Sequence, residues 1–221
     1  MKLTRRRLLR WHLWLGWAVA VPLLLWTASG LFMTLRPIEA VRGTPLRAEL
    51  PALSALAPVA PSIAPGRIES LSLKQTALGP RWIVTARDGA RRAADPRSGL
   101  LLPPLTRAEA ASAGRAYRAK GGTVTGLALS DAAHPPLDLR QDRPAWAVTF
   151  DDGARFYIDA DTGELLAVRT RYWRAYDWMW GLHIMDLESR EDFHHPLLIG
   201  FAALALANVA LGTILLFKRT R

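Results

Sequence analysis

Residues 145–165 read AWAVTFDDGARFYIDADTGEL, and residues 81–101 read RWIVTARDGARRAADPRSGLL. The two stretches align without a gap at an offset of 64 residues. In each stretch apolar and polar residues alternate, an Asp-Gly pair interrupts them at Gly89 or Gly153, and the alternation resumes, which predicts a β-hairpin with a tight turn. A second turn is predicted at Gly99 and Gly163. The middle of the chain is therefore predicted to be an internal repeat of antiparallel strands.

Further elements are predicted ahead of each hairpin. Short strands precede them over residues 68–73 and 124–129. Thr106 and Glu109 have the spacing of a capping box and open an alanine-rich helix that ends near Gly121. Residues 46–56 are the weaker counterpart of this helix in the first repeat, because Pro51 interrupts them. The expected order is helix, strand, strand, strand, twice over, which is an α+β arrangement.

Both ends of the chain carry long apolar runs. Residues 11–35 and 196–217 contain no Asp, Glu, Lys or Arg, and each is long enough to cross a bilayer as a helix. Basic residues without acidic neighbours lie outside them: Lys2, Arg5, Arg6, Arg7, Arg10, Lys218, Arg219 and Arg221. This pattern predicts a multi-pass protein with two transmembrane helices, both termini cytoplasmic, and the domain between them on the far side of the membrane.

Other interpretations of the ends are weaker. The net charge of +10 comes mainly from the termini, whereas 21 basic residues face 19 acidic ones in the rest of the chain, so a nucleic-acid surface is not expected. Residues 4–10 resemble a twin-arginine export signal, but the apolar run that follows exceeds a usual signal core. The chain has no cysteine, which excludes disulfides, thiolate metal sites and covalently attached c-type haem.

The remaining segments complete the predicted domain plan. Residues 1–10 and 218–221 are the cytoplasmic ends, and proline-rich residues 36–66 are a linker or arm. The two repeats cover residues 67–104 and 105–170. Residues 171–195 are expected to form an interfacial amphipathic helix, because Trp173, Tyr176, Trp180 and His183 share one face at helical spacing.

A family resemblance rests on the second repeat. Its Trp-Ala-Val strand and its YIDADTGEL segment, residues 157–165, resemble the PepSY domain, a small unit of a helix and an antiparallel sheet. The first repeat resembles a diverged copy. With an apolar helix at each end, the whole chain resembles a PepSY-associated transmembrane protein of the bacterial inner membrane, in a small two-helix form with a tandem of periplasmic PepSY-like units. Asp159, Asp161 and Thr162 are polar enough for a metal site, but turn chemistry explains them better, and no metal is expected.

Histidines are the candidate cofactor ligands that this resemblance implies. Larger members of the group have four membrane helices whose histidines hold b-type haem, and some reduce ferric siderophores. The corresponding candidates here are His12, His183, His194 and His195, while His134 lies beside two prolines in a predicted loop. His12 is at the cytoplasmic end of the first apolar run and His194 and His195 precede the second, so one haem cannot join them within one protomer. A homo-oligomer or a partner membrane subunit is expected to complete such a site.

Two functions follow as hypotheses. The first is a haem-associated electron-transfer component, a subunit of a ferric-siderophore-type reductase that delivers electrons to a periplasmic acceptor. The second is a non-enzymatic binding, regulatory or accessory subunit that modulates a partner protein. The sequence contains neither a nucleotide-binding glycine motif nor a Ser, His and Asp constellation that would indicate hydrolysis, and it assigns no catalytic residue.

Overall fold

The computed structural model describes residues 4–53, 57–63 and 65–218. Lys2, Arg219 and Arg221 of the basic ends lie outside the described residues, as do residues 54–56 of the predicted first-repeat helix. The described chain divides into two units, which are residues 1–37 together with 175–221, and residues 38–174. The fold is mixed α+β with two antiparallel sheets and an apolar helix at each end, as predicted.

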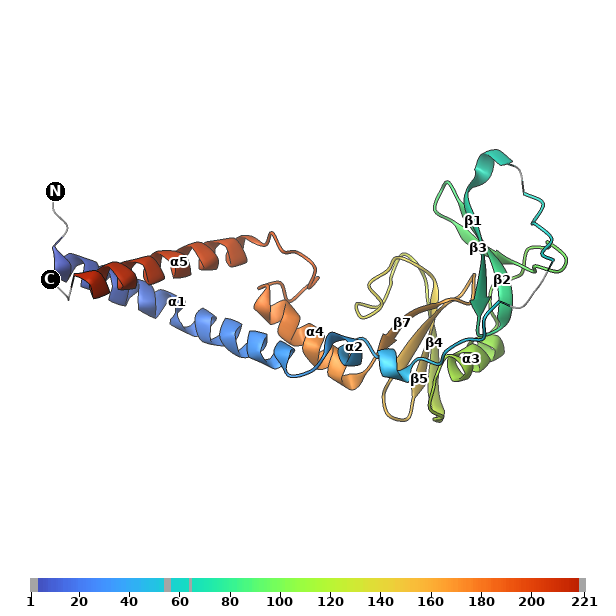
Figure 1. Cartoon of the computed structure of the whole chain (residues 1–221), viewed down its shortest axis with the longest axis horizontal. Helices are drawn as coiled ribbons and strands as arrows, with labels where there is room; N and C mark the ends of the chain where they lie inside the picture. Colours follow the sequence, from blue (N-terminus) through green and yellow to red (C-terminus); the bar gives the residue numbers. More distant parts are fainter. Residues whose placement is uncertain (1–3, 54–56, 64, 219–221) are drawn as a thin grey trace. The chain divides into compact units, whose positions relative to one another are not determined.

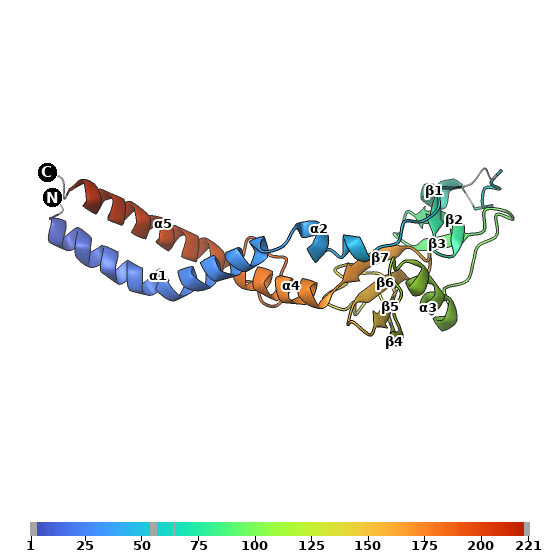
Figure 2. The same ribbon diagram turned by 60° about the horizontal axis from the view of Figure 1, so that its bottom comes forward.

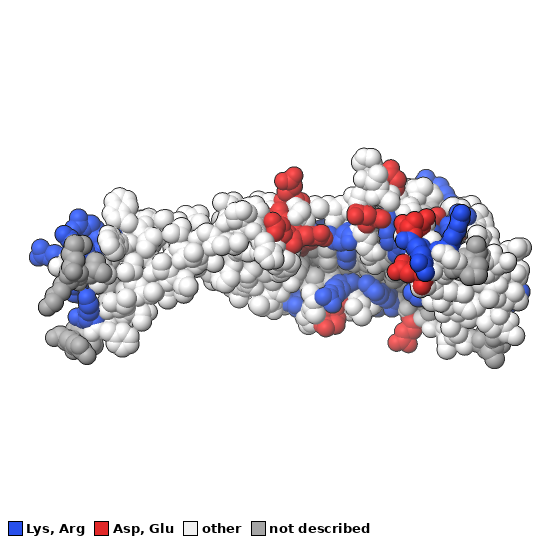
Figure 3. Space-filling view, turned by 90° about the horizontal axis from the view of Figure 1, so that it is seen from above, with Lys and Arg blue, Asp and Glu red and all other residues white. Residues whose placement is uncertain are grey.

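The first unit is built on the two apolar helices. Helix α1 covers Arg5–Thr34 and helix α5 covers Pro196–Phe217. They run antiparallel, with both termini at the same end (Figures 1 and 2). Figure 3 shows described Lys and Arg side chains gathered at that end, next to a long stretch without charged side chains. Both helices are long and apolar enough to cross a membrane, and their most apolar stretches are 11% and 0% buried.

Helix α4 covers Arg171–His183 and is shorter than the helix predicted over residues 171–195. The chain leaves the helix because Met185 adopts a positive φ of 58°. The Asp186 carboxylate then accepts backbone N–H groups of residues 188, 189, 191 and 192, which fixes a loop before α5. The hydrogen bonds from Ser189 and these amides lower the pKa of Asp186. A carboxylate that collects amides in this way competes with further helix.

The second unit contains the two repeats. Its elements are α2 (Ile38–Val41), the 3₁₀ turns η1 (Thr44–Leu46) and η2 (Pro65–Arg67), β1 (Ile68–Thr76), β2 (Gly79–Ala86), β3 (Arg91–Ala94), α3 (Arg107–Ala116), β4 (Val124–Ser130), β5 (Ala145–Phe150), β6 (Arg155–Asp159) and β7 (Leu165–Arg169). The first sheet has the order β1-β2-β3 and the second β4-β5-β6-β7, both antiparallel.

The offset of 64 holds at the level of backbone hydrogen bonds. Ala86 N–H donates to Ala90 O at 2.8 Å, and Phe150 N–H donates to Ala154 O at 2.9 Å. The second turns match in the same way, since Gly99 N–H and Gly163 N–H each donate to the aspartate carbonyl four residues earlier. All four turn glycines adopt positive φ, as the Asp-Gly and Ser/Thr-Gly patterns predicted. The predicted hairpins are confirmed.

The two repeats differ in how their sheets are covered. In the second repeat α3 packs against β4, β5 and β6, with Ala113, Gly114 and Tyr117 over Val148. In the first repeat the predicted helix over residues 46–56 is wrong in its described part, where Thr44–Leu46 is a 3₁₀ turn and Arg47 bridges to Arg118. Pro51 lacks the N–H that a helix would need there. The second sheet also has a fourth strand, β7, which is reduced in the first repeat to the bridge between Ala94 and Leu101.

Candidate functional site

His12 lies between the two apolar helices. Its Nδ1 is 3.1 Å from the backbone carbonyl of Asn208 on α5. Gly212 is one turn further along α5, and a Cβ added there would lie 3.1 Å from His12 Cε1. The absence of a side chain at Gly212 therefore makes room for the imidazole ring.

His183, the last residue of α4, packs against the other end of α1. Its Nδ1 is 3.0 Å from the Trp26 carbonyl and 3.1 Å from Ser29 Oγ. The ring stacks on the Trp26 indole, with centroids 4.6 Å apart. A Cβ added at Gly30 would lie 3.2 Å from His183 Cε1, so a glycine again makes room for a histidine.

The geometry selects one tautomer for both histidines. A carbonyl oxygen only accepts hydrogen bonds, so His12 and His183 must each carry a proton on Nδ1 to donate to it. The lone pair of a neutral ring then lies on Nε2. This is the tautomer in which imidazoles oriented by a backbone carbonyl bind metals.

His12 and His183 are not brought together. His12 and Ser29, the contact of His183, are seventeen residues apart on one helix, which is about 25 Å of helix rise. His194 is exposed in the loop, where its backbone N–H donates to Asp192. His195 precedes α5, and its buried Nδ1 has no hydrogen-bond partner among the described residues. His12 and His183 therefore cannot be the two axial ligands of one haem within one protomer. No cluster of three or more metal-ligating side chains occurs in the described ranges.

The polar residues of the second repeat that were considered for a metal site, Asp159, Asp161 and Thr162, form its second turn. Asp159 Oδ1 accepts the backbone N–H groups of Asp161 and Thr162 at 3.0 and 2.8 Å. The other carboxylate oxygen contacts the Arg143 guanidinium. Burial, followed by the charge of Asp159, raises the pKa of Asp161. These contacts are those of a buried turn, as the sequence indicated.

The helix of the second repeat begins as its capping box predicted. Thr106 Oγ1 accepts the Glu109 N–H at 3.3 Å, and the Glu109 carboxylate accepts the Thr106 N–H at 2.8 Å. Directly before the N-cap of the helix, Leu105 O accepts the Trp146 indole N–H at 3.1 Å. The Tyr117 hydroxyl donates to Gly163 O at 2.8 Å and ties the helix end to the second turn.

A family comparison covers this unit. The model of the peptidase propeptide and YPEB domain, PepSY, matches residues 104–169. The second repeat is a PepSY domain. No curated protein and no solved structure matches the chain significantly. The apolar helices at both ends fit a PepSY-associated transmembrane protein, and the resemblance inferred from the second repeat is confirmed.

Glu164 links the PepSY domain to the first repeat. Its carboxylate is 2.9 Å from Lys74 Nζ on β1 and 2.7 Å from an Arg91 guanidinium nitrogen on β3. Burial raises the pKa of Glu164, but the hydrogen bond from Lys74 and the charge of Arg91 outweigh it, so the pKa lies below its ordinary value. This three-residue contact joins the two sheets of the unit.

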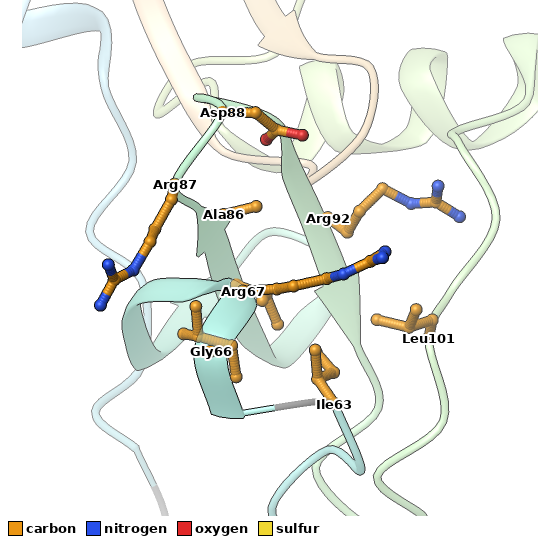
Figure 4. Close-up of a pocket in the computed structure, with 10 residues that line it drawn as sticks. Ile63, Gly66, Arg67, Ala86, Arg87, Asp88, Arg92 and Leu101 are labelled. Carbon is orange, nitrogen blue, oxygen red and sulfur yellow. The ribbon is translucent and has the colours of Figure 1, made fainter.

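A pocket on the first repeat was not found from the sequence. It encloses about 400 Å³ on the first sheet and is lined by ten residues: Ile63, Gly66, Arg67, Ile68, Val84, Ala86, Arg87, Asp88, Arg92 and Leu101. In Figure 4 Arg67 lies across the pocket and Arg92 extends from β3 on the same side, whereas Arg87 points away. The repeat alignment could have indicated the pocket, because Ala86 and Arg92 align with Phe150 and Phe156 of the PepSY domain.

Proposed function

We propose that this chain is a PepSY binding module, anchored in the bacterial inner membrane, that modulates a partner protein on the periplasmic side. The observation that carries the proposal is the PepSY domain at residues 104–169, set between two apolar helices that the described fold leaves unburied. The family description associates this domain with peptidase propeptides. We infer that this module, like a propeptide, acts by association with another folded protein.

Membrane anchoring is supported by the surface of the two helices. The core helix of a soluble protein is mostly buried, whereas α5 has no buried residue and α1 buries only Leu8, Val19 and Ser29. Apolar surface on this scale needs lipid or protein to cover it. Described basic residues gather at the end of the helix pair where the two termini lie, which favours a cytoplasmic location for both termini.

The topology can be tested directly because the chain has no cysteine. Thr4→Cys marks the N-terminal end and Ala133→Cys marks an exposed loop of the PepSY domain. A membrane-impermeant maleimide added to intact spheroplasts should label only the Ala133→Cys variant. Labelling of Thr4→Cys, or of neither variant before lysis, would contradict the proposed orientation.

The binding function is tested by site-specific photo-crosslinking in living cells. A photoreactive residue is placed at exposed positions of the PepSY domain, and at exposed positions of α5 as the matched control for membrane neighbours. We expect a discrete adduct with another protein from the PepSY positions. Adducts only from α5, or none beyond lipid and the chain itself, would contradict a binding module.

Electron transfer through haem is a second candidate, favoured by His12 and His183. Both rings donate Nδ1–H to a backbone carbonyl, which leaves Nε2 for a metal. A b-type haem would supply one-electron chemistry, for example toward a ferric siderophore. Because His12 and His183 contact the helix pair about 25 Å apart, one haem cannot bind both in the same protomer. A haem on either histidine would need its second axial ligand from another residue, from another copy or from a partner subunit.

The absorption spectrum of the purified chain separates the two candidates. For the haem candidate we expect a Soret band that is lost in His12→Ala or His183→Ala, with the exposed His134→Ala as control. Protein purified from haem-replete cells without a Soret band, or with a band that none of these substitutions changes, would eliminate it. The binding module needs no such band.

A further inference from the structure

The pocket of the first repeat lies where the PepSY domain carries its helix. Its lining includes Val84 and Ala86 on β2, and Arg92 on β3. The corresponding residues at the offset of 64 are Val148, Phe150 and Phe156, all buried in the core that α3 covers. Thus a helix covers this face in the second repeat, whereas in the first repeat the described residues leave a pocket there, above a Val84 that is 5% exposed and beside Ile63 and Leu101.

Further contacts align the two faces. The Trp146 indole N–H donates to Leu105 O, directly before the N-cap of α3. The Trp82 indole N–H makes the same kind of bond, to Val59 O at 2.8 Å. Both β1 and β4 begin with a register shift, at Ile68 and at Val124. Ile68 lines the pocket, and the equivalent residue Val124 packs against the core under α3. Val59 therefore occupies the place of Leu105.

The connection that follows Val59 is too short to supply a covering helix. Eighteen residues, 106–123, separate Leu105 from β4, and ten of them form α3. Only eight residues, 60–67, separate Val59 from β1. A helix of ten residues is about 15 Å long and needs further residues to return to the sheet. The first repeat therefore cannot close its own face in the way the PepSY domain does.

The open face differs from its closed counterpart in size and charge. Ala86 replaces Phe150, which deepens the floor, and Arg92 replaces Phe156, which places a charge at the rim. Arg67 lies across the same opening (Figure 4). Neither Arg67 nor Arg92 forms a salt bridge with any residue that the structure describes. The lining also includes the Asp88 carboxylate, and the charge of Arg92 acts on Asp161, but Arg67 and Arg92 outnumber the one carboxylate that lines the pocket. A ligand for this face should therefore bring large apolar side chains and negative charge.

We propose that this face is the docking groove for an amphipathic helix of the partner protein, with large apolar residues along one stripe and carboxylates beside it. The partner helix takes the position that α3 occupies on the PepSY domain, with its carboxylates on Arg67 and Arg92. This inference rests on the proposed binding function and adds the chemistry of the bound segment. Large side chains of the incoming helix fill the volume that Phe150 fills in the other repeat.

The probe is a fluorescent, helix-stapled peptide with leucines at positions i, i+3, i+4 and i+7 and glutamates on both flanks. Its binding to the full chain in detergent is measured by anisotropy, beside a twin peptide with lysine for every glutamate. Three variants are compared with the native chain: Arg92→Glu, Ala86→Trp, which fills the pocket, and Arg107→Glu, which makes the same charge change at an exposed position on α3. Circular dichroism confirms that each variant is folded.

We expect saturable binding of the glutamate peptide that weakens about tenfold or more in Arg92→Glu and in Ala86→Trp but not in Arg107→Glu. The lysine peptide should prefer Arg92→Glu to the native chain. Absence of saturable binding, or equal binding to all the variants, would overturn the groove. The two proposals fail separately: an in-cell adduct that persists in Ala86→Trp removes the groove and keeps the binding module, whereas no adduct at any position removes the module itself.

Discussion

Glu164→Gln should weaken the contact between the two repeats, because the Glu164 carboxylate binds one residue on each edge strand of the first sheet. Its side chain is 16% exposed, and it contacts Lys74 on β1 and Arg91 on β3. Glutamine keeps the size of the side chain and removes the charge. The Arg91 and Lys74 side chains then lose their counter-charge, and Arg91, which is 24% exposed, cannot turn fully to water.

The expected cost is about 2 kcal/mol. A charge-assisted hydrogen bond such as that from Arg91 contributes about 1.5 kcal/mol. The Lys74 bond adds only about 0.5 kcal/mol, because that side chain is 49% exposed and its charge is screened by solvent. For a unit of this size, about 4 °C per kcal/mol applies, so the melting temperature should fall by roughly 8 °C.

The pH dependence identifies the charge as the cause. The pKa of Glu164 is lower in the folded chain than in the unfolded chain. Its contribution to stability is therefore complete above the ordinary glutamate pKa of about 4.3 and is lost as the pH falls through the lowered folded value. The difference between the native chain and Glu164→Gln should be full at neutral pH and should shrink once the pH falls below about 4.

Urea unfolding in a mild detergent, followed by near-UV circular dichroism, measures this difference. Glu49→Gln is the matched control, because Glu49 is exposed and forms no salt bridge within the described ranges. It should change the unfolding free energy by less than about 0.5 kcal/mol. A Glu164→Gln effect no larger than that of Glu49→Gln, or one that persists undiminished at pH 3, would refute the reasoning.

Two other substitutions test how α3 closes the PepSY domain, by the same urea assay. Thr106→Ala removes the capping hydroxyl that Glu109 N–H donates to and should cost about 1 kcal/mol, while an unchanged midpoint would mean that the cap is dispensable. Gly114→Leu should cost about 1–3 kcal/mol, because even a Cβ at Gly114 would lie 2.7 Å from Val148 Cγ1. Combining it with Val148→Ala should recover part of the loss, and strictly additive losses would contradict overpacking as the cause.

The sequence was sufficient for features that short-range chemistry determines. The Asp-Gly turns at Gly89 and Gly153 and the capping box at Thr106 each depend on neighbours within a few residues, so their patterns predicted them correctly. The amphipathic helix after residue 171 was predicted too long, because the aromatic spacing continues while Asp186 collects the backbone amides of the following loop. The spacing of apolar residues does not reveal that a carboxylate will accept the backbone amides and end the helix.

The contacts of the histidines could not be predicted in the same way. His12 meets Asn208 across 196 positions and His183 meets Ser29 across 154, so both depend on how separate helices pack. Small residues gave a partial signal, since Gly212 and Gly30 lie where each ring needs space. Their role became visible only with the partner helix in place. Whether these rings bind a cofactor stays a prediction.

The open groove illustrates how a repeat can give rise to a binding surface. A copied unit conserves its hairpin easily, because the Trp82 strand and its Asp-Gly turn are locally encoded. Its covering helix depends on a connection, and residues 60–67 are too few to form one. Without that helix, a phenylalanine at the position of Phe150 would expose a large apolar side chain, and Ala86 avoids this. Arg92 places a charged side chain at the pocket in place of a second phenylalanine. The substitutions that make the first repeat tolerate an open face also define the size and charge of a segment that can close it.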